Sequence, residues 1–231
     1  MRERKNADAP LAERCGRMAS EYDRGKDAQG WRGPEVVFGL LYEFVGPGES
    51  VLDIGIGTGL GSALFHKAGL RVHGMDMSPE MLKVCEKKRM TEALKLHDLT
   101  TEPYPYAEAS LDHAVCVGVL NHFEDLGPVF RETSRILRDS GVFGFIVADM
   151  RPDETPSFHV EHADSRVTMF RHGRSQIFDL MDRNAFEPLR ELEFSVAGHD
   201  GRSAPFRLRA YAARRRMRGG QAGGTGTGEA R

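Results

Sequence analysis

The chain has 231 residues, of which 40% are hydrophobic and 29% are charged, and its formal net charge is −2. This length suits one domain with modest additions, and the composition is that of an ordinary globular protein. The near-neutral charge provides no overall basic field for nucleic acid, and no apolar run approaches the length of a membrane span. The first ten residues, MRERKNADAP, contain no apolar segment that could act as a secretory signal, so we expect a cytoplasmic location.

Three cysteines are scattered singly along the chain, at Cys15, Cys85 and Cys116. Their spacing predicts neither a disulfide framework nor a zinc site, and we expect no metal site. Residues 1–48 combine a highly charged start with a helical stripe of apolar residues over 34–45. We therefore expect this region to form a helical cap that packs on the rest of the chain.

The most informative stretch is SVLDIGIGTGLGS at residues 50–62, which predicts a buried strand, a glycine-rich turn and the first turn of a helix. Its acidic residue and alternate glycines have the spacing D-x-G-x-G-x-G, at Asp53, Gly55, Gly57 and Gly59. Glycines lack the Cβ atom that would keep a ligand off the backbone, and they permit the tight turn that directs the helix towards that ligand. We predict a nucleotide-type pocket at the carboxyl end of this strand.

The spacing departs from the dinucleotide fingerprint G-x-G-x-x-G, because the third glycine comes one residue early and an acidic residue precedes the first glycine. A carboxylate would repel a pyrophosphate, whereas it suits a ligand with cationic groups. The pattern resembles motif I of the class I S-adenosylmethionine-dependent methyltransferases, whose cofactor carries an ammonium and a sulfonium group. A glycine turn in some other α/β protein is the alternative.

A second strand is predicted over residues 71–77, RVHGMDM, with Asp76 at its end and a helix start at Ser78-Pro79-Glu80. Asp76 lies 23 positions after Asp53. This is close to the separation of about 20 residues that is expected for an acid that binds a ribose diol in doubly wound folds. The family resemblance implies that Met77 packs against the adenine ring. A helix-capping carboxylate and a plain packing methionine are the alternatives.

A short third strand is predicted over residues 94–99, LKLHDL. The family resemblance implies that Asp98 accepts a hydrogen bond from the adenine amine, and that Leu99 packs on the ring. A carboxylate that accepts hydrogen bonds is chemically suited to the amine. Alternatively, Asp98 simply ends the strand.

The run LDHAVCVGVL at residues 111–120 predicts a central fourth strand. The sequence GVLNHF that overlaps its end resembles the corresponding motif of ubiquinone-biosynthesis-like methyltransferases. This resemblance implies that Val117 and Gly118 lie at the cofactor, and that Asn121 and His122 lie nearest the chemistry. An imidazole with an ordinary pKa of about 6.5 could act as a base for a protonated acceptor. Packing under the cofactor is the alternative for His122.

Tyr22 and Asp23, in the segment SEYDR, resemble a Tyr-Asp pair that type-11-like small-molecule methyltransferases often carry in this region. The resemblance implies that Tyr22 closes over the cofactor, and Trp31 is a second candidate for such a lid. An aromatic side chain that anchors an N-terminal helix is the alternative for Tyr22.

The C-terminal half begins with an amphipathic helix over 128–137 and a turn that resembles the family's LKPGG, followed by a fifth strand. Residues 151–165 are polar and contain prolines, so we expect a solvated loop on the substrate side. Four potential ligands cluster there without a helix to align them, and they indicate a metal site only weakly: His159, Glu161, His162 and Asp164.

Further on, residues 167–189 predict a short strand, a turn at Gly173 and a helix that ends at Asn184-Ala185-Phe186, where the family has a Gly-Phe pair. Residues 192–198 and 206–214 predict an antiparallel hairpin. The resemblance implies an α/β fold: a doubly wound, seven-stranded, mostly parallel sheet with this hairpin at one edge and helices on both faces. Residues 49–213 would form this Rossmann-like domain, and the Arg/Gly-rich residues 214–231 would be a disordered tail.

The predicted reaction is transfer of a methyl group from S-adenosylmethionine to an O, N or C atom of a small molecule, which leaves S-adenosylhomocysteine. No added domain or basic face indicates a macromolecular acceptor, and the Asn-Pro-Pro-Tyr motif of amino-methylating enzymes is absent. The alternatives are an RNA or protein methyltransferase and a non-catalytic cofactor-binding module. An NAD-dependent oxidoreductase would need a later third glycine and a motif such as Tyr-x-x-x-Lys. The sequence gives no indication of the oligomeric state or of the acceptor's identity.

Overall fold

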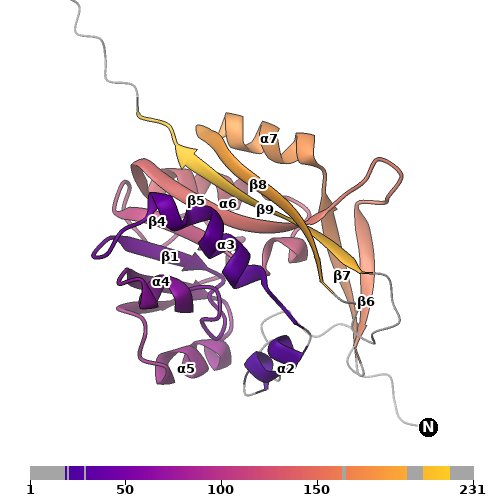
Figure 1. Ribbon diagram of the computed structural model, residues 1–231, viewed down its shortest axis with the longest axis horizontal. Helices are drawn as coiled ribbons and strands as arrows, with labels where there is room; N and C mark the ends of the chain where they lie inside the picture. The colour runs from indigo at the N-terminus through magenta and orange to yellow at the C-terminus, as the bar shows by residue number, and fades with distance from the viewer. Residues whose placement is uncertain (1–18, 20, 29, 163–164, 197–204, 219–231) are drawn as a thin grey trace, which may run out of the picture.

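The computed structural model describes residues 19, 21–28, 30–162, 165–196 and 205–218. These residues form a twisted sheet with helices on both faces (Figure 1). The strands are β1 (Ser50–Ile54), β2 (Arg71–Asp76), β3 (Ala93–Leu96), β4 (Leu111–Cys116), β5 (Leu137–Asp149), β6 (Ser157–His162), β7 (Ser165–His172), β8 (Phe186–Val196) and β9 (Phe206–Arg215). The helices are α2 (Tyr22–Ala28), α3 (Gly33–Leu41), α4 (Ala63–Lys67), α5 (Pro79–Lys87), α6 (Gly127–Ile136) and α7 (Arg174–Arg183), with short 3₁₀ turns η1 (Tyr42–Phe44) and η2 (Leu120–His122).

The main sheet has the strand order β3-β2-β1-β4-β5-β9-β8. The first five strands in this order are parallel to one another, and β9 is antiparallel to both β5 and β8. This topology confirms the predicted fold class, a doubly wound and mostly parallel sheet with an antiparallel C-terminal hairpin. The last strand of the hairpin lies inside the sheet, between β5 and β8.

Two hydrophobic clusters cover the two faces of the sheet. Helices α3, α4 and α5 pack on one face, and α6 and α7 pack on the other (Figure 1). Strand β1 is buried on both faces, with Val51 in the first cluster and Leu52 and Ile54 in the second. A strand covered on both faces needs such an apolar run, which is why this stretch was recognisable. Within the described part of the chain, no helix has both the length and the apolar character that a bilayer crossing requires.

The solvated loop predicted over residues 151–165 is wrong, because β6 occupies part of it and pairs antiparallel with β7. The hairpin projects beyond the main sheet (Figure 1), and β7 joins it through a short parallel pairing that includes Asp149 and His172. Phe158 and Val160 are half-buried whereas His159 is exposed, so β6 alternates as a strand with one covered face should. Asp164 and the side chains of Glu161 and His162 lie outside the described residues, among which no group of potential metal ligands is found.

Several predicted element ends need correction. Strand β3 ends at Leu96 and β4 ends at Cys116, so Asp98 and Val117 lie in the loops that follow these strands. Strand β9 runs to Arg215, beyond the predicted start of the tail, and the buried Arg215 side chain donates from Nε to the Ser134 carbonyl over 3.0 Å. Residues 219–231 of the predicted tail and residues 1–18 of the predicted cap lie outside the described residues.

Candidate functional site

The carboxyl ends of β1, β2 and β3 lie side by side, because the three strands are neighbours and parallel. Ile54 pairs with Met75 and Asp76 pairs with Leu96, so the loops after these strands start at the same edge of the sheet. The backbone N–H of Gly55 also donates to the Met75 carbonyl over 2.9 Å. This pairing brings together the predicted cofactor residues of the first three strands at the edge where doubly wound folds bind their ligands.

The glycine-rich loop adopts the left-handed backbone that its sequence predicts, with φ of +73° at Gly55, +54° at Gly57 and +91° at Gly59. A Cβ atom on Gly55 would lie 2.6 Å from Val119 Cγ2, and one on Gly59 would lie 1.9 Å from Met90 Cε. Gly55 is therefore required by packing as well as by conformation, whereas at Gly59 the flexible end of Met90 could move and the backbone conformation is the stronger requirement. At Gly57 no atom of the described residues, apart from its own chain neighbours, lies within 4 Å of the Cβ position, so among these residues the backbone here faces open space.

Asp76 connects the glycine-rich loop to the start of α5. Its Oδ2 accepts a hydrogen bond from the Gly57 N–H and its Oδ1 accepts one from the Ser78 N–H, both over 2.8 Å. Burial raises the pKa of Asp76, and these backbone hydrogen bonds oppose the shift. Each carboxylate oxygen has two lone pairs, so each retains an acceptor position. Binding of a ribose by Asp76, and of adenine by the half-buried Met77 beside it, stay predictions.

Asp53 lies beneath the loop rather than on its open side. Its side chain is 2% exposed, and its Oδ2 accepts a hydrogen bond from the Ser62 hydroxyl at the start of α4. Burial raises the pKa of Asp53 to about 7; the Ser62 hydrogen bond lowers it and the charge of Asp76 adds to the rise. The carboxyl group is therefore only partly ionised at neutral pH. Its predicted contact with the cofactor's ammonium group stays a prediction.

Asp98 and Leu99 follow β3 at the same edge. Oδ1 of Asp98 accepts hydrogen bonds from the backbone N–H of Thr100 over 2.9 Å and from its hydroxyl over 2.8 Å, which closes a turn beyond the strand. The Leu99 side chain is buried in the core cluster beneath α6 and α7. Asp98 therefore has the strand-ending role that was the alternative in the sequence analysis. The contacts of Asp98 and Leu99 with adenine stay predictions.

Helix α2 is attached to the glycine-rich loop by Asp23. The Asp23 carboxylate accepts a hydrogen bond from the Thr58 hydroxyl and forms an ion pair with Lys88, just beyond α5. The Lys26 ammonium lies 5.3 Å from the ring centroid of Tyr22 and 5.4 Å from that of Trp31. We call α2 together with Trp31 the N-terminal strap.

The other end of the strap reaches β4. A Cβ atom on Gly118 would lie 3.5 Å from Cζ2 of Trp31, and Gly118 itself has a φ of +78°. The strap therefore extends from the glycine-rich loop to the end of the fourth strand, the two positions at which the predicted cofactor residues lie. Closure of the half-buried Tyr22 over a cofactor stays a prediction.

The predicted acceptor residues lie on η2, directly after β4. The Asn121 amide donates from Nδ2 to the sulfur of Met169 on β7 over 3.3 Å, and His122 is half-buried beside it. Val117 and Asp53 both lie beside Gly61. A Cβ atom on Gly61 would be 3.3 Å from Val117 Cβ and 2.8 Å from Asp53 Oδ2. The structure thus brings Asn121 and His122 between the glycine-rich loop and the β6–β7 hairpin, and their catalytic roles stay predictions.

His172, the last residue of β7, falls in a segment that resembles one of the family in which a histidine precedes a helix, but the sequence analysis gave it no role in the site. Its side chain is 1% exposed, and burial lowers its pKa. The backbone of Leu120 and Phe123 and the side chain of Gln176 lie beside the ring and favour its protonated form, but within the described part of the chain neither ring nitrogen has a partner in hydrogen-bonding geometry. His172 is therefore a neutral imidazole packed against η2. A polar residue at the end of a strand, immediately before Gly173, was the signal that could have identified it.

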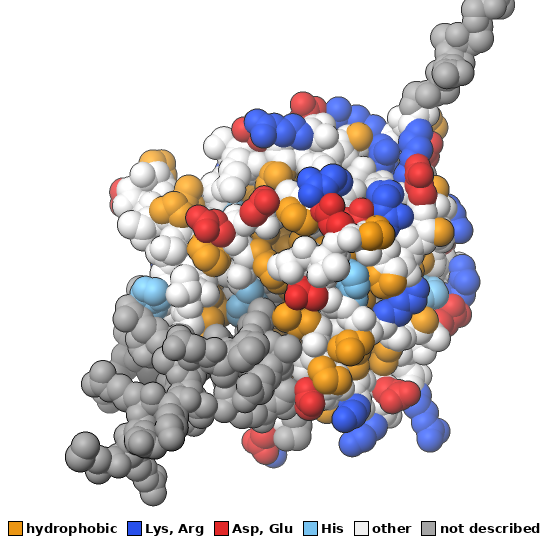
Figure 2. Space-filling view, turned by 180° about the vertical axis from the view of Figure 1, so that it is seen from behind, with side chains coloured by type: hydrophobic (Ala, Val, Ile, Leu, Met, Phe, Trp, Pro, Cys, Tyr) orange, Lys and Arg blue, Asp and Glu red, His pale blue; other side chains and the backbone are white. Residues whose placement is uncertain are grey.

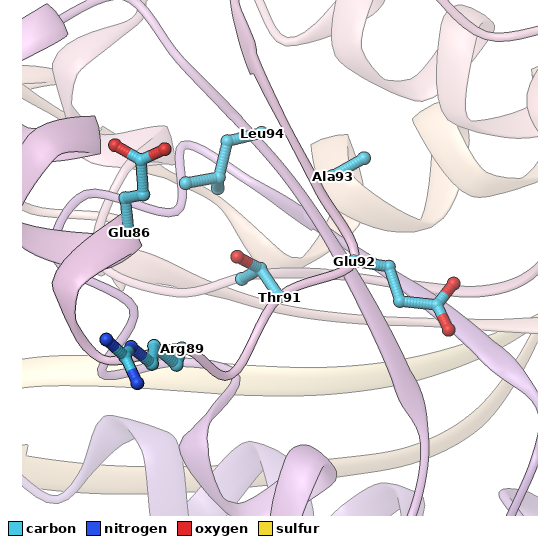
Figure 3. A pocket seen from close by; sticks show the side chains of 6 residues that line it. All are labelled: Glu86, Arg89, Thr91, Glu92, Ala93 and Leu94. Carbon is cyan, nitrogen blue, oxygen red and sulfur yellow. The ribbon is translucent and has the colours of Figure 1, made fainter.

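Two hollows differ in their relation to this site. In Figure 2, hydrophobic side chains line a hollow between the projecting β6–β7 hairpin and the body of the domain, with acidic and histidine side chains around it. Another hollow, of about 380 Å³, lies at the amino end of β3 (Figure 3) and is lined by Glu86, Arg89, Thr91, Glu92, Ala93 and Leu94. Because ligands of doubly wound folds bind at the carboxyl ends of the strands, the hollow in Figure 3 is not part of the candidate site.

Comparison with known proteins gives matches to methyltransferases. Residues 52–145 match the family described as a methyltransferase domain. Demethylmenaquinone methyltransferase of Chlorobaculum parvum is 35% identical over 104 residues, which cover 44% of this chain and 42% of that protein. Malonyl-[acyl-carrier protein] O-methyltransferase of Serratia marcescens is 33% identical over 99 residues, 43% of this chain and 38% of that protein. These alignments therefore cover less than half of each relative.

A solved structure matches over a longer part of the chain. The 1,6-didemethyltoxoflavin-N1-methyltransferase of Burkholderia thailandensis, solved with 1,6-didemethyltoxoflavin and S-adenosylhomocysteine, has a TM-score of 0.61 and 22% sequence identity. The match covers 91% of this chain and 93% of that one, and it shows a shared fold. Residues 52–145 therefore resemble a methyltransferase domain, and most of the chain shares the Rossmann-like fold of this structural neighbour.

Proposed function

We propose that this chain transfers the methyl group of S-adenosylmethionine to an O, N or C atom of a small molecule and releases S-adenosylhomocysteine. The observation that carries the proposal is the row of carboxylates at the ends of β1, β2 and β3, beside a glycine-rich loop whose backbone is open at Gly57. Carboxylates and an uncovered backbone suit a ligand with cationic groups and ribose hydroxyls better than they suit a pyrophosphate.

The residues present fit this cofactor. The free space at Gly57 is a cradle that any Cβ atom would begin to fill, and Asp76 would hold the ribose beside it. Asp53 lies beneath the loop, where its charge would favour the cationic amino acid part of the ligand. Asp98, Leu99 and Met77 would surround the adenine, and Val117 and Gly118 would complete the pocket.

The cofactor supplies a methyl group on a sulfonium, which is already a good leaving group. The protein therefore has to orient the acceptor in line with that methyl group and exclude water, and such positioning can lower a barrier by several kcal/mol. Tyr22 and Trp31 of the strap would cover the cofactor side. On the acceptor side, the Asn121 amide would orient the acceptor, and His122 would remove a proton from acceptors that arrive protonated.

A small-molecule acceptor is supported by the shape and lining of the reverse face. The hollow in Figure 2 is apolar with a polar surround, which is typical of small-molecule sites. The named relatives act on demethylmenaquinone and malonyl-[acyl-carrier protein], and the structural neighbour holds 1,6-didemethyltoxoflavin. The first and third of these names support a small-molecule acceptor for this chain, whereas the second is that of an acyl group carried on a protein.

Calorimetric titration of the purified chain with S-adenosylmethionine and with NAD tests the cofactor. We expect binding of the first and not of the second, and Asp76→Ala should weaken binding roughly tenfold or more because it removes an acceptor of charge-assisted hydrogen bonds. Glu187→Gln, at an exposed position on β8, is the matched control and should leave binding unchanged. Binding of NAD alone would overturn the proposal.

Release of S-adenosylhomocysteine over a panel of hydroxylated and amino-bearing metabolites tests the reaction. We expect turnover with a member of one chemical class. Turnover only with RNA or protein would assign the chain to the macromolecular methyltransferases. Tight cofactor binding without turnover on any of these acceptors would favour a non-catalytic cofactor-binding module.

A further inference from the structure

Asp23 connects three segments that are far apart in the sequence. Its Oδ1 accepts a hydrogen bond from Thr58, 35 positions later, and its Oδ2 forms an ion pair with Lys88, 65 positions later. Thr58 lies between Gly57 and Gly59 and is 1% exposed, so this hydrogen bond reaches the interior of the glycine-rich loop. One carboxylate on the strap therefore contacts both the loop and the end of α5.

The strap has little stability of its own. Helix α2 has only seven residues, and isolated helices of fewer than about 12 residues are marginal in water. Its position therefore depends on contacts with the rest of the chain. Two of these contacts attach its ends: Asp23 contacts the glycine-rich loop, and Trp31 lies against Gly118.

The two attachments differ in chemistry. Trp31 packs through an aromatic ring, whereas Asp23 uses charge, and the side chains of Lys88 and Asp23 are 29% and 39% exposed. An ion pair that is exposed to this extent is weakened by salt and contributes little net free energy. The Asp23 end is therefore the end at which the strap can separate from the loop at the lower energetic cost.

We propose that Asp23 is a positioning residue of the cofactor site, and that its contacts with Thr58 and Lys88 form an electrostatic latch that controls entry and release of the cofactor. The proposal rests on the proposed function, because it takes S-adenosylmethionine as the ligand beside Gly57. When the Asp23 contacts are formed, the strap extends from the glycine-rich loop to Gly118. Opening the Asp23 end uncovers the loop while Trp31 remains in place.

The test measures the dissociation rate of S-adenosylmethionine from the full chain by stopped-flow displacement. Asp23→Ala should speed dissociation about tenfold, since both polar contacts are lost. Lys88→Met should speed it about threefold, the effect of one partly exposed ion pair. Lys87→Met, an exposed lysine one position earlier, is the matched control and should leave the rate unchanged.

Salt dependence separates a latch from a purely structural contact. Wild-type dissociation should accelerate between about 0.05 M and about 0.5 M sodium chloride, whereas Lys88→Met should lose most of this acceleration. The double variant Asp23→Lys with Lys88→Asp restores an ion pair of reversed polarity, and it should recover part of the slow, salt-sensitive dissociation. Melting temperatures of all variants check that each is folded.

The possible failures are distinguishable. If the variants bind S-adenosylmethionine with wild-type dissociation rates and wild-type salt dependence, the latch is wrong and the proposed function stands. If the wild-type chain binds no S-adenosylmethionine, the proposed function and the latch both fall.

Discussion

The two halves of the sheet build their parts of the site in different ways. In the cofactor half, β1 to β3 with their loops, each predicted residue lies within or just beyond a strand in a short motif, and parallel pairing aligns the motifs. In the acceptor half, β5 to β9, contacts join distant positions, as between Asn121 and Met169 or between Asp149 and His172. The site residues of the cofactor half can therefore be predicted from local sequence motifs. Those of the acceptor half cannot, because their contacts depend on how distant strands pair.

The largest expected effect is a loss of cofactor binding without a loss of fold. Gly57→Ala places a Cβ atom in the open space of the cradle and should weaken S-adenosylmethionine binding at least about 100-fold, because ligand and side chain compete for one volume. Its φ of +54° adds only about 1–2 kcal/mol of strain. Calorimetry and thermal melting check the two parts separately. An equal loss in both measurements would show that Gly57 serves the fold.

The second largest effect is expected for Asp53→Asn, which should increase the free energy of unfolding and weaken cofactor binding. Asp53 has a folded-state pKa raised from 3.8 to about 7, so its neutral form is the one that the fold favours. Its contribution to stability is fully present below about pH 4 and is lost as pH rises through about 7. Asp53→Asn should therefore be more stable than wild type at pH 8, by up to about 4 kcal/mol, and nearly equal to it at pH 4.

The same substitution should weaken S-adenosylmethionine binding, because an amide cannot attract the ammonium group. In the wild type, affinity should increase from pH 6 to pH 8 as Asp53 ionises, and this increase should be absent in Asp53→Asn. Chemical denaturation and titration at these pH values measure both quantities. A variant that is less stable than wild type at pH 8 would contradict the buried-charge account.

A smaller and separate effect is expected in the acceptor half. His172→Phe should lower turnover roughly tenfold while S-adenosylmethionine affinity stays within about twofold, because the ring packs on η2 and not on the glycine-rich loop. His172→Gln, which retains a polar group, should recover part of the turnover. The acceptor found in the panel assay provides the measurement. Weakened cofactor binding would show that the two halves are coupled more tightly than their contacts indicate.

The smallest expected effect concerns the β6–β7 hairpin. Phe158 is half-buried on its covered side, with the Arg171 guanidinium 4.1 Å from its ring centroid. Phe158→Ala should raise the KM for the acceptor a few-fold and leave kcat and cofactor affinity unchanged, since the Phe158 ring packs on Phe206 of β9 with centroids 5.2 Å apart and so holds the hairpin that borders the proposed acceptor hollow. Steady-state kinetics with His159→Ala, on the exposed side, provides the control. A change in kcat alone would contradict this assignment.

The cofactor half was predictable because glycine conformation and strand ends are local properties. The left-handed glycines and the Ser78 N-cap follow from residue type. In contrast, the φ of +56° at Ala185 after α7 does not, because a residue with a Cβ atom disfavours the left-handed region. The hydrogen bond from Gly57 to Asp76 was not predictable, since it depends on how the loop after β1 lies against the end of β2.

The errors also have physical causes. The predicted third and fourth strands are too long because their apolar patterns continue beyond the last paired residues, which are Leu96 in β3 and Cys116 in β4. Strand β6 was missed because prolines precede it and its alternation rests on only two apolar residues, Phe158 and Val160, within an otherwise polar segment. His172 was overlooked because its burial results from pairing with β5 and contact with η2, and neither is visible in its own segment.

The position of β9 has a consequence for the order in which the protein is made. Residues 142–148 of β5 have β9 as their antiparallel partner, and residues 206–215 that form β9 are translated long after β5. Until they emerge from the ribosome, a long apolar strand keeps one edge unpaired, and such edges are prone to association with other chains. A nascent chain that stalls before residue 206 should therefore depend on chaperones, even though its entire cofactor half has already been synthesised.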